Sequence, residues 1–300
     1  MTEPESRLDG RFAPTPSGPL HFGSLVTAVA SYCQARSTQS AWYLRIEDVD
    51  TPRVVAGSSD SILRTLEQFG FEWDGDVIYQ SQRFPAYEEV LQQLIDQKQV
   101  YACQCSRKSL LREQPAFGPL GMIYPANCRH AKLPIPGHAL RLNLEAAGEV
   151  TMQDAIYGRY SLDLARQVGD VVMKRVDGVY AYHLAVVLDD DWQGIREVVR
   201  GADLLAVTPL HLYLYQLLGL PAPAYMHLPL ARNADGKKLS KQTGAQPLSP
   251  NDAGRQLVSA LRFLEQAVPD GLEREHPHNI LRLAINQWSP SRIPALDAST

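Results

Sequence analysis

Hydrophobic residues in the first hundred positions follow two spacings, one typical of buried strands and one typical of helices. Residues 41–46 form a mostly apolar run of strand length. Residues 25–35 and 60–69 repeat apolar side chains at helical spacing, and a glycine follows the second of these segments. Residues 77–79 and 87–96 continue the order with a short strand and another helix. This alternation predicts a parallel α/β sheet with right-handed crossovers.

The pattern changes between residues 101 and about 161, where closely spaced cysteines, a short basic helix and a proline-rich stretch interrupt the alternation. Helix–strand order then resumes in five segments, at residues 170–174, 179–182, 185–191, 195–199 and 208–218. Beyond Pro250 the apolar spacing is helical. We therefore expect a doubly wound, Rossmann-like parallel sheet in two halves, with an insertion and a short helical C-terminal region. The expected boundaries are 1–100 for the first half, 101–165 for the insertion, 166–245 for the second half and 246–300 for the helical region.

The composition is that of an ordinary globular protein. The chain has 300 residues, of which 45% are hydrophobic and 21% charged, enough for a sizeable core. A net charge of −4 excludes a broad basic field, so any RNA contact must be local and shape-based. No apolar run reaches the roughly 20 residues that span a bilayer, and the polar N-terminus is unlike a signal peptide. The four cysteines are too few and too uneven for a disulfide framework, which indicates a reducing cytoplasm. We also expect a monomer without membrane contact.

Residues 10–24, GRFAPTPSGPLHFGS, predict a strand end, a tight loop and a helix start. Three prolines stop the strand because they remove hydrogen-bond donors and fix φ. The start of a helix presents unpaired N–H groups and a partial positive charge, which suit a phosphate. Gly23 allows close approach to the backbone, and His21 can donate to a phosphate oxygen. A proline-rich turn with an incidental histidine is the plainer interpretation, and we favour the phosphate site.

A lysine-rich loop offers a second phosphate contact. Residues 236–242, GKKLSKQ, follow an apolar run and place Lys238, Ser240 and Lys241 in a polar segment. A cation in such a loop can swing onto a triphosphate. Taken alone, this segment is better explained as ordinary solvated surface.

Together, the two loops resemble the paired nucleotide-binding motifs of class I aminoacyl-tRNA synthetases. Residues 21–24, HFGS, are similar to the HIGH motif, and residues 238–242, KLSKQ, to the KMSKS motif. RFAP at 11–14, LRIEDVD at 44–50 and VRGADL at 199–204 resemble the catalytic domain of glutamyl-tRNA synthetases. The resemblance covers roughly residues 8–245. It implies that His21 and Lys241 are catalytic and that ATP is bound by His21, Gly23, Ser24, Lys238, Ser240 and Lys241.

The region after the lysine loop departs from the glutamyl-tRNA synthetase pattern. Those enzymes continue into a large helical anticodon-binding region, whereas here about sixty residues follow the loop. This shorter form resembles the glutamyl-Q tRNA synthetase family. The resemblance implies transfer of activated glutamate to queuosine, the modified wobble base of tRNA(Asp), with the anticodon stem-loop entering the active site. Such RNA is recognised through loops, stacked bases and shape.

Cys103, Cys105 and Cys128 have a spacing that favours a metal site in the insertion. Two cysteines that bracket one residue can converge with a third that returns after a loop, and thiolates favour tetrahedral zinc. Ligand chemistry alone leaves Tyr124, His130 and water as fourth ligands and favours His130. The glutamyl-Q family carries C-x-C…Y-x-x-x-C as its metal set, which implies Tyr124. A site closed by four protein ligands is structural, and the alternative is three reduced cysteines without metal.

Charged residues at the ends of predicted strands match an amino acid with two carboxylates and one ammonium group. Arg11 and Arg200 can bind carboxylates through their planar forks, and Glu47 can bind an ammonium group. The plainer interpretations are a surface salt bridge for Arg200, a capping carboxylate for Glu47 and a core aromatic for Tyr182. In the family these positions contact the amino acid. The implied substrate-binding residues are Arg11, Phe12, Ala13, Pro14, Thr15, Glu47, Tyr182 and Arg200.

The implied reaction is the ATP-dependent activation of L-glutamate. The α-carboxylate attacks the α-phosphorus of ATP, pyrophosphate leaves, and glutamyl-adenylate forms. His21, the helix N-terminus, Lys241 and a magnesium ion would neutralise charge in the transition state. The alternatives are a conventional glutamyl-tRNA(Glu) synthetase, a small-molecule amine ligase on the same fold, or a silent tRNA-binding paralogue. The complete set of motif residues argues against silence.

Overall fold

The sheet at the centre of the protein joins strands from both halves of the chain. The computed structural model describes residues 7–231 and 246–296. The first group of strands is parallel, in the order β1 (Gly10–Phe12), β2 (Trp42–Ile46) and β3 (Ile78–Tyr79). The second group contains the parallel pair β11 (Glu197–Gly201) and β12 (Ala224–Leu228). The amides of Arg196 and Glu197 donate to the carbonyl of Asp9 at 2.9 and 3.2 Å, so β11 begins beside β1. The expected α/β fold with a parallel sheet is confirmed.

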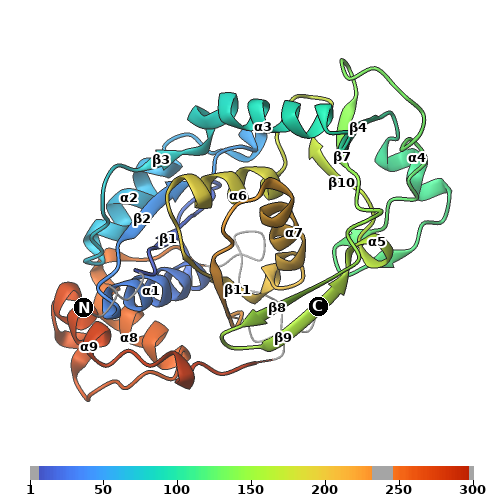
Figure 1. The fold of residues 1–300 in the computed structure, drawn as a ribbon. Coiled ribbons are helices and arrows are strands. Elements are labelled where there is room, and N and C mark those ends of the chain that lie inside the picture. The colour runs from blue at the N-terminus through green and yellow to red at the C-terminus, as the bar shows by residue number, and fades with distance from the viewer. Residues whose placement is uncertain (1–6, 232–245, 297–300) are drawn as a thin grey trace, which may run out of the picture.

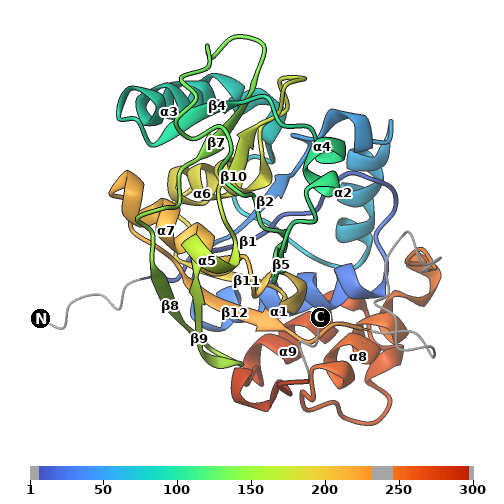
Figure 2. The ribbon, with the colours of Figure 1, turned by 90° about the vertical axis from the view of Figure 1, so that its right-hand side faces the viewer.

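Helices cover both faces of this sheet (Figure 2). One face packs against the core that contains α1 (Phe22–Ser37), α2 (Ser58–Gln68), α8 (Ala253–Phe263) and α9 (Pro277–Asn286). The other packs against the core that contains α3 (Phe84–Asp96), α6 (Tyr182–Trp192) and α7 (Thr208–Leu218). The helical region near the C-terminus therefore completes the first core. Within the described residues, no helix combines the length and the apolar character needed to cross a membrane.

Gly70 shows how closely α2 approaches the C-terminal helices. The residue follows α2 in the left-handed region, with φ of 79°, where a side chain would be strained. A Cβ at this position would lie 2.8 Å from the backbone nitrogen of His278 at the start of α9. The glycine that sequence analysis assigned as a helix stop is thus also required for packing.

The insertion forms its own antiparallel sheet, on the right of Figure 1. Its strand order is β10 (Val171–Lys174), β7 (Ala139–Leu142) and β4 (Val100–Cys103). Smaller elements complete it: α4 (Arg107–Arg112), β5 (Phe117–Gly118), β6 (Gly121–Met122) and α5 (Leu164–Gln167). Residues 170–174, which we expected to resume the main alternation, instead pair with β7. A short apolar strand carries no information about its partner, and here tertiary contacts decide it.

A hairpin from the expected insertion extends the main sheet. Strands β8 (Glu149–Asp154) and β9 (Gly158–Asp163) pair in antiparallel fashion, and β8 adjoins β12 through Asp154 and Tyr225. The hairpin therefore brings Asp154 to the edge of β12. Short 3₁₀ turns occur at Thr51–Arg53, Gln80–Arg83, Ala202–Leu204, Pro250–Asp252, Leu272–Arg274 and Pro290–Arg292.

Candidate active site

The sequence-predicted residues converge on one pocket at the carboxyl ends of the parallel strands. The cavity has a volume of ≈ 590 Å³, within the usual range for small-molecule sites. The predicted residues that line it are Arg11, Phe12, Ala13, Pro14, Thr15, His21, Gly23, Ser24, Glu47, Tyr182 and Arg200. Lys238, Ser240 and Lys241 lie outside the described residues. The expectation that Arg11 and Arg200 face one cleft therefore agrees with the geometry.

His21 stands at the junction of the proline-rich loop and α1. It is the N-cap of the helix, and its Nδ1 accepts from the backbone amide of Ser24 at 3.3 Å. Since Nδ1 accepts, the ring proton lies on Nε2, where it can be donated to a ligand. The first turn of α1 holds no acidic side chain. The positive end of the helix is therefore not cancelled locally.

Arg11 is held by a carboxylate from α6. Its Nε donates to Asp190 Oδ1 at 3.0 Å, and Arg45 NH2 donates to the same oxygen at 2.7 Å. All three side chains are buried. Burial alone would raise the pKa of Asp190, but Arg11 and Arg45 lower it. Asp190 therefore remains ionised and fixes Arg11. Sequence analysis missed it, although three consecutive aspartates at the end of the apolar run of α6 were a usable signal.

The Glu47 carboxylate is largely buried and can accept a further hydrogen bond. Its Oε1 lies 3.5 Å from Arg45 NH2 and has no hydrogen-bond partner among the described residues. Burial raises the pKa of Glu47, and the neighbouring charges of Arg45 and Arg11 partly oppose this rise. A buried carboxylate of this kind is stabilised when a cation pairs with it. Glu47 is thus suited to an ammonium group.

Arg200 has neutral partners. Its Nε faces His227 Nε2 at 3.2 Å, and its NH2 donates to Thr208 Oγ1 at 2.8 Å. Its NH1 lies 3.3 Å from the hydroxyl of Tyr182, and burial raises the pKa of Tyr182 to about 12, so this phenol stays neutral. Across residues 7–231 and 246–296, no carboxylate lies within ion-pair distance of Arg200. A buried guanidinium with neutral partners favours an anionic ligand.

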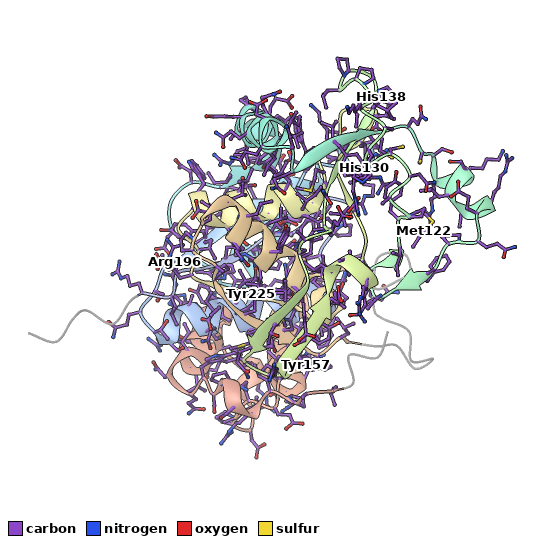
Figure 3. The ribbon with its side chains drawn as sticks, turned by 45° about the vertical axis from the view of Figure 1, so that its right-hand side comes forward. Met122, His130, His138, Tyr157, Arg196 and Tyr225 are labelled. Carbon is purple, nitrogen blue, oxygen red and sulfur yellow. The ribbon has the colours of Figure 1, made fainter. Side chains whose placement is uncertain are left out.

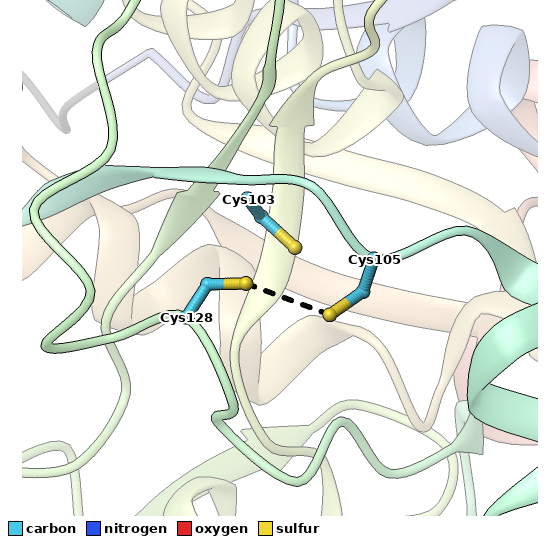
Figure 4. Close-up of side chains that lie close together, drawn as sticks. All are labelled: Cys103, Cys105 and Cys128. Atoms are coloured by element: carbon cyan, nitrogen blue, oxygen red, sulfur yellow. Dashed lines mark hydrogen bonds between the residues drawn. The ribbon is translucent and has the colours of Figure 1, made fainter.

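The three predicted cysteines of the insertion also converge (Figure 4). The sulfur atoms of Cys103, Cys105 and Cys128 lie within 4.8 Å of one another, and the Cys105–Cys128 distance is 3.5 Å. This separation is far longer than a disulfide bond of about 2.05 Å, and it suits sulfurs that share a tetrahedral zinc ion. The hydroxyl of Tyr124 lies 3.3 Å from Cys103 Sγ and 3.6 Å from Cys105 Sγ. These four donors fit a closed metal site.

His130 does not join this group. Its side chain is exposed, and Figure 3 shows it on the insertion beside the strands. Among the described residues, the only metal-ligand group of histidine, cysteine and carboxylate donors is the cysteine trio. The preference for His130 as the fourth ligand, which came from ligand chemistry alone, is therefore wrong, because its side chain lies away from the three sulfurs. Cys33 is buried in α1, and burial raises the pKa of its thiol, as expected for a core cysteine.

Comparison with known proteins places this geometry in context. A family model of class I tRNA synthetase catalytic domains (E and Q) matches residues 7–257. The chain is 51% identical to the glutamyl-Q tRNA(Asp) synthetase of Dechloromonas aromatica, over 95% of each chain. It is 50% identical to the protein of that name from Pseudomonas aeruginosa, over 95% of this chain and 94% of the relative.

Solved structures share the fold. A glutamate tRNA ligase from Elizabethkingia meningosepticum superimposes with a TM-score of 0.80 at 24% identity. The match covers 97% of this chain and 66% of that one, so the chain spans about two thirds of the solved protein. A glutamate-tRNA synthetase from Elizabethkingia anophelis gives the same TM-score of 0.80 at 23% identity.

Proposed function

The chain belongs to the family of class I tRNA synthetase catalytic domains, which are ligases, and from this we propose that it activates L-glutamate with ATP and transfers the glutamyl group to queuosine in tRNA(Asp). The names of its relatives support queuosine as the acceptor. The pocket supports glutamate as the amino acid.

One observation carries the choice of amino acid. Arg11, Arg200 and Glu47 line the same cavity, and of the two arginines only Arg11 has a carboxylate partner among the described residues. A ligand with two carboxylates and one ammonium group would pair with all three side chains. We assign the carboxylates to Arg11 and Arg200 and the ammonium group to Glu47, with Tyr182 beside Arg200.

In the first step, an α-carboxylate oxygen of glutamate attacks the α-phosphorus of ATP. The new O–P bond forms as the bond to the bridging oxygen of the β-phosphate breaks, and pyrophosphate leaves with that electron pair. His21 Nε2 and the N-terminus of α1 stabilise the developing negative charge. Lys241 and the magnesium ion that accompanies ATP would add further positive charge. In the second step, a queuosine hydroxyl attacks the acyl carbon, AMP leaves, and the hydroxyl proton passes to solvent.

We assign a structural zinc ion to Cys103, Cys105, Cys128 and Tyr124. Zinc, when bound, supplies a rigid crosslink between the start of the insertion and the loop that returns to it. Arg141 supports this cluster, since its Nε donates to Cys103 Sγ at 3.2 Å and its guanidinium lies 3.8 Å from the centre of the Tyr124 ring. The Arg141 side chain thus contacts two of the four donors.

Pyrophosphate exchange tests the first step. We expect exchange with glutamate and ATP in the absence of tRNA, and little exchange with aspartate or glutamine. Queuosine-containing and queuosine-lacking tRNA(Asp) then serve as matched acceptors, and only the first should become glutamylated. Charging of tRNA(Glu) instead would establish the conventional synthetase. Absence of exchange under all conditions, with tRNA bound, would support the silent tRNA-binding paralogue and overturn the proposed activity.

A further inference from the structure

We propose that His227 and His211 are positioning residues for Arg200, which they hold in place through unprotonated ring nitrogens without cancelling its charge. This inference rests on the proposed function, in which Arg200 binds a carboxylate of glutamate. Neither histidine lines the cavity, and both act through Arg200.

His227 and Asp154 form the first support. Arg200 Nε donates to His227 Nε2 at 3.2 Å, and His227 Nδ1 donates to Asp154 Oδ2 at 2.7 Å. An ionised carboxylate can only accept, so the ring proton must lie on Nδ1 and Nε2 is the acceptor that faces Arg200. The Thr208 hydroxyl lies 3.0 Å from the same nitrogen and donates to the carbonyl of Leu204 at 2.9 Å. Hydrogen bonds from His227 and from the backbone lower the pKa of Asp154 in spite of burial, so its charge persists.

Asp154 is itself fixed by the hairpin that carries it. Its Oδ1 accepts from the backbone amides of Ile156 and Tyr157, each at 2.9 Å, and its Oδ2 accepts from the amide of His227 at 3.1 Å. The side chains of Asp154 and His227 are both fully buried. The β8–β9 hairpin thus determines which nitrogen of His227 faces Arg200.

His211 and His183 form the second support, from α7 and α6. His211 Nδ1 lies 3.3 Å from both NH1 and NH2 of Arg200, and its Nε2 lies 3.2 Å from His183 Nδ1. A guanidinium can only donate, so Nδ1 of His211 must accept and Nε2 must carry the proton. Burial and the charge of Arg200 lower the pKa of His211 well below its usual value. His211 and His227, the two histidines that contact Arg200, therefore remain neutral acceptors.

Neutral acceptors and carboxylates differ in what they do to the positive charge of Arg200. A guanidinium is planar, so acceptors at Nε and at the far nitrogens fix the orientation of the whole group. A carboxylate in either position would fix it equally well but would pair with its charge. Imidazoles leave that charge available to a ligand, which is what recognition of an anion in a buried pocket requires.

The two supports use different ring nitrogens, and this allows a crossed test. A glutamine places its carbonyl oxygen where Nε2 of histidine lies, and an asparagine places it where Nδ1 lies. We therefore expect His227→Gln and His211→Asn to keep the contact with Arg200, whereas His227→Asn and His211→Gln lose it. His278→Gln, at a side chain that is 52% exposed, is the matched control.

The measurement is pyrophosphate exchange as a function of glutamate and of ATP concentration, with the melting temperature of each variant. Loss of a hydrogen bond to a charged group should raise KM for glutamate by about tenfold or more in His227→Asn and His211→Gln. The two retaining variants should stay within about threefold of the parent, and KM for ATP should not change. Equal KM for glutamate in all four variants, or a fall in kcat and melting temperature alone, would overturn the inference. Absence of glutamate activation by the parent would instead overturn the proposed function on which the inference depends.

Discussion

The histidines around Arg200 predict that the protein loses stability on mild acidification. In an unfolded chain, histidines take up protons near pH 6.5. In the folded protein, burial and the charge of Arg200 lower the pKa of His183 to about 4 and hold that of His211 well below its ordinary value. The unfolded state therefore binds more protons below pH 6.5, and the free energy of unfolding falls as the pH falls.

The magnitude follows from the two pKa values of each histidine. A histidine that stays neutral in the folded state lowers the free energy of unfolding by about 1.4 kcal/mol at pH 5.5 relative to neutral pH. His183 and His211 together give about 3 kcal/mol, and His227, whose pKa is also lowered, adds to this. The loss is large beside the roughly 5–15 kcal/mol that stabilises a typical domain. Glu47 acts in the opposite direction, because burial raises its pKa in the folded state.

Urea denaturation at pH 7.5 and pH 5.5 measures this effect. A comparison of the parent with His211→Asn cancels the contribution of Glu47, which both proteins share. We expect the parent to lose about 1.4 kcal/mol more than the variant between the two pH values. If the free energy of unfolding changes equally with pH in the two proteins, His211 takes up a proton in the folded state as readily as in the unfolded state. Its assignment as a neutral acceptor would then be wrong.

Two further predictions concern a lysine of the KMSKS-like loop and a cysteine of the expected metal site. Lys241→Ala should slow adenylate formation by about 100-fold or more, the scale for losing one transition-state donor, and a single-turnover rate within twofold of the parent would remove Lys241 from the mechanism. Cys105→Ser should lower the zinc content of the purified protein, measured by plasma emission spectrometry. Cys33→Ser, at a buried core position, is the control and should retain the zinc. Equal zinc content in both variants would refute the cysteine site.

The placement of the pocket residues could be predicted because it follows from chain topology. Arg11 and Glu47 come at or directly after the ends of parallel strands, and the carboxyl ends of such strands meet at one edge of the sheet. Arg200 lies near the end of β11, which runs beside β1. His21 precedes the first helix, where its ring can serve as a cap. The position of each residue at a strand end or a helix start was therefore enough to predict that they share one site.

The supporting residues could not be found in the same way. Asp154 belongs to a hairpin in the expected insertion, and only the pairing of β8 with β12 brings it to His227. His211 has the spacing of an ordinary core residue in α7. The fourth donor at the cysteine cluster likewise depends on tertiary placement, which ligand frequency does not predict. Ligand frequency favours His130, but the fold turns its side chain to solvent and places the Tyr124 hydroxyl beside the sulfurs.

The balance of buried charge gives a physical reason for choosing an acid over its amide. Among the buried side chains that the structure describes at this pocket, three guanidinium groups, Arg11, Arg45 and Arg200, accompany two carboxylates, Asp190 and Glu47, while the more exposed Arg53 and Asp203 on its lining offset each other. With both acids ionised, one positive charge remains, and it lies on the guanidinium whose partners are neutral. Glutamate, with one net negative charge, would leave the occupied pocket neutral, whereas glutamine would leave a buried cation unpaired, which is costly in a low-dielectric site. On the proposed function, selectivity against the amide would thus depend less on contacts to the side chain than on the neutral partners of Arg200 among residues 7–231 and 246–296.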